Sequence, residues 1–349
     1  METPMRKLLA STALALVALS ATACANDTKP ADTAPQSDKK ITVYSGRSES
    51  LIKPLLENFK TASGITVEVR YGDTAAMAAQ LLEEGDKSPA DLFFAQDAGA
   101  LGAVAKKGLF SKLPADVLSK VPTAYQAKTG EWVGVTGRSR VLVYNSDLVT
   151  KDQLPKSVLE LTDPKWKGKV GIAPTNGSFQ AFVTALRVQQ GEAKAKEFLT
   201  GLKANEAQIR PNNGQIVADV NSGKLSVGLV NHYYVYEKAK ADGTTADKLK
   251  AQLHFFPEGD IGALVNVAGL GIMKKAEKDP DVKVFVDYLL GTEGQKYFAE
   301  KTYEYPLIAG VATAPNLPEL KALKVPSVDL NDLDTLKATT DLIKETGLA

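Results

Sequence analysis

The sequence predicts an α/β fold built as two lobes that are joined by two crossing strands. Short apolar strands alternate with amphipathic helices along the chain, an order typical of a mostly parallel sheet with right-handed crossovers. Two long apolar segments, 138–144 and 264–273, bracket a central block of about 125 residues. This spacing is expected if the chain crosses from one lobe to the other and returns, which creates a hinged cleft where a ligand can bind.

Three strands with their helices are predicted in the first part of the chain. The first strand is Ile41–Ser45, and the helix after it carries apolar residues at helical spacing. Ile65–Tyr71 alternates apolar and polar residues as a second strand, and Thr74 caps the next helix. Asp91–Ala95 is a buried type of strand. Polar segments follow these three strands at 45–48, 72–73 and 96–97, where ligands of parallel sheets commonly bind.

The middle of the chain repeats this pattern. Strands are predicted at Lys169–Ala173 and Leu225–Val230, with a helix at Phe179–Val188 and another that begins near Asn213. The long apolar segment that starts at Leu264 leads into further helices near the C-terminus. These elements are expected to form the lobe that lies between the two long strands of the sequence.

Two adjacent tyrosines, Tyr233 and Tyr234, follow the strand 225–230 where a helix is expected to begin. A phenol normally loses its proton near pH ~10. A bound trivalent cation is a large local charge that can displace this proton and bind the phenolate oxygen. The pair therefore indicates a ferric-iron site, although neighbouring tyrosines can also pack one ring inward and hydrogen-bond the hydroxyl.

The composition argues against several classes of function. With 42 basic and 41 acidic residues the net charge is +1, which provides no basic surface of the kind that binds nucleic acid. The chain has two histidines, His232 and His254, so a histidine-based zinc site or a Ser-His-Asp triad is disfavoured. No nucleophile elbow, phosphate loop or dinucleotide-binding motif is present. We therefore expect that the protein is not an enzyme.

The N-terminal residues predict export and a membrane tether. A basic start at 5–7 precedes an apolar stretch, 8–21, that is shorter than the ~20 residues of a membrane-spanning helix. Cys24 is the single cysteine and follows Ala21-Thr22-Ala23, which resembles the lipobox of bacterial lipoproteins. We expect a signal peptide at 1–23, lipidation of Cys24, a disordered linker at 24–39, and a location on the extracytoplasmic face of the cell membrane.

Seven segments in register resemble the bacterial ferric-iron-binding proteins of ABC importers, the "bacterial transferrins". They are Ser88–Asp91, Thr136–Tyr144, Pro164–Gly168, Pro174–Phe179, Asn231–Tyr234, Gly262–Leu264 and Glu304–Leu307. The resemblance covers nearly all of residues 40–349. It implies a type II periplasmic-binding fold with a ferric ion between the lobes, and delivery to a membrane permease with a cytoplasmic ATPase.

The expected lobes follow from the crossing strands and this resemblance. The first lobe comprises 40–138 and 264–310, the second lobe comprises 139–263, and 311–349 forms a C-terminal helical segment. The resemblance makes Tyr233 and Tyr234 the principal iron ligands. It places a pocket for a synergistic anion, such as carbonate or phosphate, at Asn176, Gly177, Ser178, Asn213 and Asn231. Backbone N–H groups and the helix dipole favour an anion at 176–178, and an ordinary helix N-cap is compatible with the same residues.

Two positions depart from the family pattern. Ser48 stands where many members carry a histidine ligand in the first lobe, and Gln96 stands where several carry a glutamate. Arg138 and Arg140 alternate on one strand and suit a planar oxyanion, although surface ion pairs are an alternative. Candidates for a replacement ligand are Tyr44, Tyr71, Glu49, Asp97 and His232.

The leading hypothesis is a lipid-anchored, monomeric ferric-iron-binding protein that serves an ABC permease and its ATPase. The rival hypothesis keeps the fold but changes the ligand to a small organic anion, such as a phosphonate or phosphate ester, held by the 176–178 loop and Arg138. The substitutions at Ser48 and Gln96 favour the rival.

Overall fold

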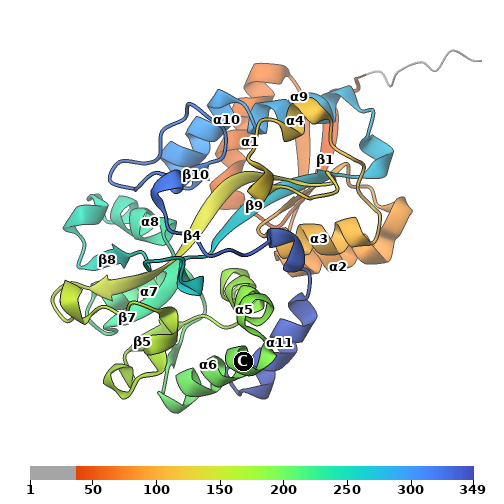
Figure 1. Ribbon diagram of the computed structural model, residues 1–349. Coiled ribbons are helices and arrows are strands. Elements are labelled where there is room, and N and C mark those ends of the chain that lie inside the picture. The colour runs from red at the N-terminus through yellow and green to blue at the C-terminus, as the bar shows by residue number, and fades with distance from the viewer. Residues whose placement is uncertain (1–36) are drawn as a thin grey trace, which may run out of the picture. The chain divides into compact units, whose positions relative to one another are not determined.

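Ten strands form one curled sheet within residues 37–349, the part of the chain that the computed structural model describes (Figure 1). The central order is β2-β1-β3-β9-β4-β7-β5-β6, while β8 and β10 pair with β4 outside this path. The predicted signal peptide 1–23, Cys24 and the linker up to residue 36 lie outside the described residues. The strands are β1 Lys40–Ser45, β2 Thr66–Tyr71, β3 Leu92–Ala95, β4 Val133–Asn145, β5 Val170–Ile172, β6 Gln208–Ile209, β7 Val227–Asn231, β8 Ala251–His254, β9 Val265–Ile272 and β10 Tyr305–Pro306.

The first lobe packs helices against β1, β2, β3 and β9. Helix α1 (Glu49–Ser63) buries Ile52, Leu55 and Phe59, which lie on one face at helical spacing. It ends at Gly64, whose positive φ of 74° closes the helix with a bond to the Lys60 carbonyl. The other helices of this lobe are α2 Thr74–Glu84, α3 Ala98–Lys106, α4 Ala115–Leu118, α9 Pro280–Leu289 and α10 Thr292–Tyr297.

The second lobe packs helices against β5, β7 and the distal half of β4. Its helices are α5 Gly177–Gln190, α6 Glu192–Ala204, α7 Asn213–Asn221 and α8 Tyr233–Ala241. Asn176 and Asn212 cap α5 and α7 with their side-chain oxygens, as their residue types favour. These side chains fix the start of both helices, as the asparagines at these turns predict.

Strand β4 belongs to both lobes. Val133 to Ser139 pairs with β9, and Arg140 to Tyr144 pairs with β7. The prediction of a mostly parallel sheet is correct for β1 with its neighbours and for β5 with its neighbours. It is wrong for the long strands, because β4 and β9 run antiparallel where the chain crosses between lobes and returns.

The C-terminal segment, residues 311–349, contacts both lobes. Leu333 and Asp334 lie against α3, where Lys106 forms an ion pair with Asp334 at 2.9 Å. Helix α11 (Leu336–Glu345) packs on α5, where the buried hydroxyls of Thr339 and Thr184 are 2.7 Å apart (Figure 1). The segment is therefore a third connection between the lobes, in addition to β4 and the chain that leads into β9.

Two features of the described residues concern the predicted linker and membrane anchor. Ser37 and Lys39, at the end of the predicted linker, hydrogen-bond to the carboxylate of Asp281 on α9. No helix within residues 37–349 is long and apolar enough to cross a membrane.

The contact between α3 and the C-terminal segment can be tested with two glycines of one helix. A Cβ at Gly99 would lie 2.4 Å from the backbone oxygen of Leu333, whereas one at Gly102 would meet its nearest neighbour at 3.5 Å. We expect Gly99→Ala to lower the free energy of unfolding by about 1–3 kcal/mol because the segment must shift. Gly102→Ala, the matched control, should raise it by up to about 1 kcal/mol through helix propensity. Urea unfolding measures both, and equal effects of the two substitutions would contradict the contact.

Candidate functional site

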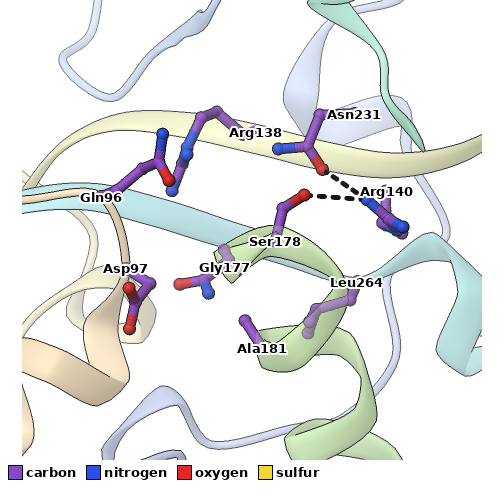
Figure 2. Close-up of a pocket in the computed structure, with 10 residues that line it drawn as sticks. Gln96, Asp97, Arg138, Arg140, Gly177, Ser178, Ala181, Asn231 and Leu264 are labelled. Carbon is purple, nitrogen blue, oxygen red and sulfur yellow. Dashed lines mark hydrogen bonds between the residues drawn. The ribbon is translucent and has the colours of Figure 1, made fainter. Parts of the chain in front are cut away.

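The space between the lobes is divided into two adjacent cavities. The smaller has a volume of about 10 Å³, room for about one water molecule, and has Arg138 and Arg140 on its wall (Figure 2). The larger has a volume of about 1000 Å³ and is lined by residues from both lobes. The residues that line both cavities are Gln96, Asp97, Gly177 and Ala181. The two cavities therefore adjoin each other at these four residues.

Tyr233 and Tyr234 begin α8 directly after β7. Their rings are stacked, with centroids 4.4 Å apart and planes inclined by 28°. Tyr233 is buried and Tyr234 is half-buried, and within residues 37–349 no hydrogen bond joins either phenol oxygen to another residue. Burial raises the pKa of Tyr233 well above its ordinary value, and Tyr234 raises it further, while Arg138 and Arg47 oppose this shift. Tyr233 is therefore a neutral phenol unless a cation displaces its proton.

His232 is not available as a replacement ligand. The ring is fully buried, and its Nδ1 accepts a hydrogen bond from the backbone N–H of Ser139 at 3.2 Å. Nε2 must then carry the proton, and it donates to the carbonyl of Tyr303 at 2.8 Å. Burial lowers the pKa of His232 to about 4. Both nitrogens thus serve to hold the start of α8 in place.

Most residues of the predicted anion pocket form one hydrogen-bond network. The Ser178 hydroxyl donates to Asn176 Oδ1 at 2.6 Å and accepts from Asn213 Nδ2 at 3.0 Å. Arg140 Nη1 donates to the same hydroxyl at 3.0 Å and to Asn231 Oδ1 at 3.4 Å (Figure 2). The network fixes the turn that leads into α5.

Gly177 stands at the first position of α5 and faces the first lobe. A Cβ at this glycine would lie 3.6 Å from the side-chain oxygen of Gln96, which is the nearest heavy atom. The predicted anion loop and the first-lobe position Gln96 therefore lie opposite each other across the cleft.

Arg138 and Arg140 occupy alternate positions of β4 but belong to different lobes. Arg138 lies opposite Asn266 of β9, and Arg140 lies opposite Asn231 of β7. Their exposed fractions are 3% and 2%, so the alternative of surface ion pairs is wrong for both. Burial lowers the pKa of Arg140 to about 9. Among the described residues, Nε and Nη1 of Arg138 and Nε of Arg140 have no hydrogen-bond partner.

Arg47 is a site residue that the sequence interpretation missed. Its Nη2 bonds both carboxylate oxygens of Glu304, at 2.7 and 2.8 Å, and both side chains are inaccessible to solvent. Burial opposes the charge of Arg47 most strongly, but the Glu304 carboxylate together with Tyr233 and Tyr234 outweighs burial and raises the Arg47 pKa. Nε and Nη1 of Arg47 have no partner within residues 37–349, and the residue lines the larger cavity. The available signal was its position in the polar segment 45–48 after β1.

Glu304 joins several parts of the site. Besides Arg47, it accepts from the hydroxyls of Thr136 and Thr302, each at 3.2 Å, and lies 3.9 Å from Arg138 Nε. It also acts on Glu237 of α8, because burial and the charge of Glu304 raise the pKa of Glu237 to about 7. The carboxylate of Glu304 thus partly balances the guanidinium groups of Arg47 and Arg138.

The first-lobe wall presents mainly neutral groups. Ser48 is exposed at the start of α1, and Gln96 is half-buried at the end of β3. Asp97 caps α3 by accepting from the Ala100 N–H at 2.9 Å, and burial raises its pKa. Across residues 37–349, no group of three or more His, Cys, Asp or Glu side chains is arranged to hold a metal. Any metal site in this part of the chain must rely on other donors.

The remaining candidate ligands fall in different places. Tyr44 points away from the cleft, since its hydroxyl donates to Glu84 of α2 at 3.0 Å. Tyr71 lines the larger cavity, and burial followed by the charge of Glu49 raises its pKa. Glu49 is exposed and pairs with Lys53 at 2.9 Å. Tyr71 is thus the only aromatic candidate of the first lobe that the cleft retains among the described residues.

Comparisons with known proteins agree with this geometry. Residues 87–332 match the family model described as bacterial extracellular solute-binding protein. The "Fe(3+)-binding periplasmic protein" of Serratia marcescens is 33% identical over 316 residues, which cover 90% of this chain and 92% of the relative. The "Major ferric iron-binding protein" of Neisseria meningitidis serogroup B is also 33% identical, over 88% of this chain and 93% of the relative. Iron-bound HitA from Pseudomonas aeruginosa matches with a TM-score of 0.83 and 33% identity, covering 88% of this chain and 99% of that one. This match confirms the predicted two-lobed type II fold.

The buried imidazole gives a pH-dependent contribution to stability. In the unfolded chain His232 gains a proton near pH 6.5, but in the folded protein only near pH 4, so the unfolded state binds more protons between these values. Stability should therefore fall as the pH drops from 6.5 to 4, by up to about 3 kcal/mol for this residue. His232→Gln should flatten this part of the profile. His254→Gln is the comparison and should flatten the profile less, because burial also lowers the pKa of His254 but that imidazole is only half-buried. Urea unfolding of the purified protein at a series of pH values measures the effect, and an unchanged slope in His232→Gln would contradict it.

Proposed function

The chain belongs to the bacterial extracellular solute-binding proteins, and among them to the ferric-iron-binding proteins, and from this premise we propose that it binds ferric ion between its lobes. It is a binding protein and not an enzyme. The ion is the cargo of the protein. Tyr233 and Tyr234 are the proposed ligands that the second lobe contributes.

The observation that carries this proposal is the stacked pair of phenols with no hydrogen-bond partner within residues 37–349. A buried phenol resists ionisation in the absence of a cation, as the raised pKa of Tyr233 indicates. A trivalent ion supplies the charge that displaces the protons. Arg138 and Arg47 lie close enough to lower the pKa of Tyr233, which favours the phenolate once the metal arrives.

The anion that accompanies the ion is proposed to bind beside the tyrosines, at 176–178, Asn213, Asn231 and Arg138. The start of α5 offers backbone N–H groups, and buried guanidinium nitrogens without partners offer further donors. An inorganic anion such as carbonate or phosphate would satisfy these donors and neutralise part of the local positive charge. Closure of the lobes around ion and anion would exclude water, which strengthens each charge interaction.

Delivery and anchoring are part of the same proposal. We propose export by the signal peptide, lipidation at Cys24 and retention on the extracytoplasmic face of the cell membrane. The loaded monomer would present its cargo to the permease of an ABC importer that is driven by its ATPase. Family membership supports this role, since solute-binding proteins of this kind are extracellular components of such importers.

A second candidate function is a receptor for a small organic anion such as a phosphonate or phosphate ester. The buried arginines with unpaired N–H groups and the neutral Ser48 and Gln96 favour it. In that case the tyrosines would stack on the ligand or on each other and would need no metal.

The two proposed functions predict different visible absorption when ferric ion is added to the protein. Phenolate-to-iron charge transfer absorbs visible light, so a titration of the iron-free protein with ferric ion should produce an absorption band. Tyr233→Phe and Tyr234→Phe should each abolish this band while the melting temperature stays close to that of the parent protein. Tyr236→Phe is the matched control on the same helix, because its ring packs on Tyr303 in a separate apolar cluster. A double Phe variant that keeps the band would refute the ligand assignment, and a parent protein that never colours would favour the organic-anion receptor.

A further inference from the structure

We infer that the C-terminal segment 311–349 is a second pivot between the lobes, so that the lobes open and close by rotation about one line. This line runs from the crossing of β4 at Ser139 to the junction between Asp334 and Thr335. Lobe motion is independent of the ligand that fills the cleft, so failure of the pivot would leave the proposed function intact. The support comes from the attachment of the segment to each lobe, the lack of slack between these attachments, and the place of the junction beside the crossing strands.

The part of the segment before α11 is attached to the first lobe. The turn 330–332 packs on α3, and Leu330 and Leu333 are buried in the main apolar core, with exposed fractions of 3% and 2%. Asn331 Oδ1 accepts a hydrogen bond from the backbone N–H of Lys128 at 3.2 Å. Detaching this part would expose both leucines to water and would therefore be unfavourable.

Helix α11 is attached to the second lobe at both of its ends. Near its start, the Thr339 hydroxyl lies 2.7 Å from that of Thr184 and accepts from Arg187 Nη1 at 2.8 Å. At its end, Glu345 pairs with Lys196 of α6 at 2.5 Å. The helix is therefore expected to move with the second lobe as one body.

The two attachments meet at one peptide bond. Asp334 forms an ion pair with Lys106 of α3 at 2.9 Å, whereas the carbonyl of Thr335 accepts from Arg187 of α5 at 3.2 Å. Helix α11 begins directly after Thr335. Consecutive Cα atoms are only about 3.8 Å apart, so the lobes cannot separate at this junction while both attachments hold. They can only turn about it.

The junction lies beside the crossing strands but apart from them. The Arg140 N–H bonds the Leu264 carbonyl at 2.8 Å, so β4 and the chain that leads into β9 act as one pivot. The first turn of α3 lies between this pivot and the segment. It donates a backbone N–H to Asn266 of β9 at 3.2 Å, and a Cβ at Gly99 would lie 2.4 Å from the Leu333 oxygen. Two bodies that are joined at two separate points can rotate only about the line through both.

This line also determines where the cleft opens. Leu333, Leu336 and Thr340 of the segment line the larger cavity. Atoms close to a rotation axis move least, so this wall of the cavity stays closed while the lobes turn. The cleft therefore widens on the side away from the segment, and a ligand enters and leaves there.

One experiment adds slack at the junction. Three glycines inserted between Asp334 and Thr335 lengthen the chain by up to about 10 Å and leave both attachments in place. Ketone-bearing amino acids replace two exposed residues, Lys60 of α1 and Lys240 of α8, and carry the dyes for single-molecule energy transfer. In the ligand-free full chain, we expect the distribution of the distance between the dyes to broaden by about 3–10 Å, because the glycines sample a range of lengths.

The same insertion after Gly310 is the matched control. Gly310 is exposed and directly precedes the segment, and a Cβ there would meet no atom within 4 Å. This variant should give the distance distribution of the parent protein, and both insertions should keep the parent melting temperature because no attachment is removed. A junction insertion that folds normally and keeps the parent distribution would overturn the inference.

A second experiment asks whether the segment stays attached while the lobes move. A Cβ at Gly102 of α3 would lie 3.5 Å from the Cβ of Asp334, a separation that suits a disulfide. Gly102→Cys with Asp334→Cys locks the segment to the first lobe, and Cys24→Ser removes the single native thiol. A pivot keeps its attachment, so the oxidised and reduced forms should give the same distance distribution. A narrower distribution in the oxidised form would mean that the segment detaches when the lobes open, and the pivot would be wrong.

Discussion

The site depends on the backbone of Ser139, where strand β4 passes from one lobe to the other. At this point the partner of β4 changes from β9 to β7, and Arg140 N–H bonds the carbonyl of Leu264 at 2.8 Å. The Ser139 carbonyl accepts from the N–H of His232 at 3.1 Å, while the Ser139 N–H donates to the His232 ring. One residue of the crossing strand therefore fixes the residue that precedes the tyrosine pair.

This arrangement explains why charged residues of both lobes meet at one place. Residues on alternate positions of a strand share a face, so Arg138 and Arg140 both reach the cleft although they pair with strands of different lobes. Glu304 lies directly before β10. It pairs with Arg47, which lies two residues after the end of β1. The result is a group of buried cations near the phenols of Tyr233 and Tyr234. Such a group is unfavourable without a compensating anion, which gives the protein a physical reason to bind one.

The C-terminal segment constrains how the two lobes can separate. Leu333 and Asp334, which precede α11, contact α3 of the first lobe. Helix α11 packs on α5 of the second lobe through the buried contact between Thr184 and Thr339. Arg187 of α5 adds hydrogen bonds to Thr339 at 2.8 Å and to the Thr335 carbonyl at 3.2 Å. Residues of this segment also line the larger cavity, so movement of the lobes changes the wall of the cleft as well as its width.

The sequence alone determined the longer strands and the capped helices, because the apolar periodicity of segments such as Ile41–Ser45 and the caps at Asn176 and Asn212 are local properties of the chain. It also indicated the adjacent tyrosines and the turn at 176–178, which are short motifs. It did not reveal the antiparallel pairing of β4 with β9 or the short strands β6, β8 and β10, whose hydrogen-bond partners are distant in the chain.

Only the tertiary structure decided which charges are buried and which side chains share the cleft. Arg47 and Glu304 are 257 residues apart, and no pattern along the chain relates them before the lobes fold. The candidate ligands His232 and Tyr44 could be set aside only when the partners of their polar atoms were known. Local spacing determines secondary structure, whereas the burial and pairing of a charged group depend on neighbours that the fold brings from elsewhere in the chain.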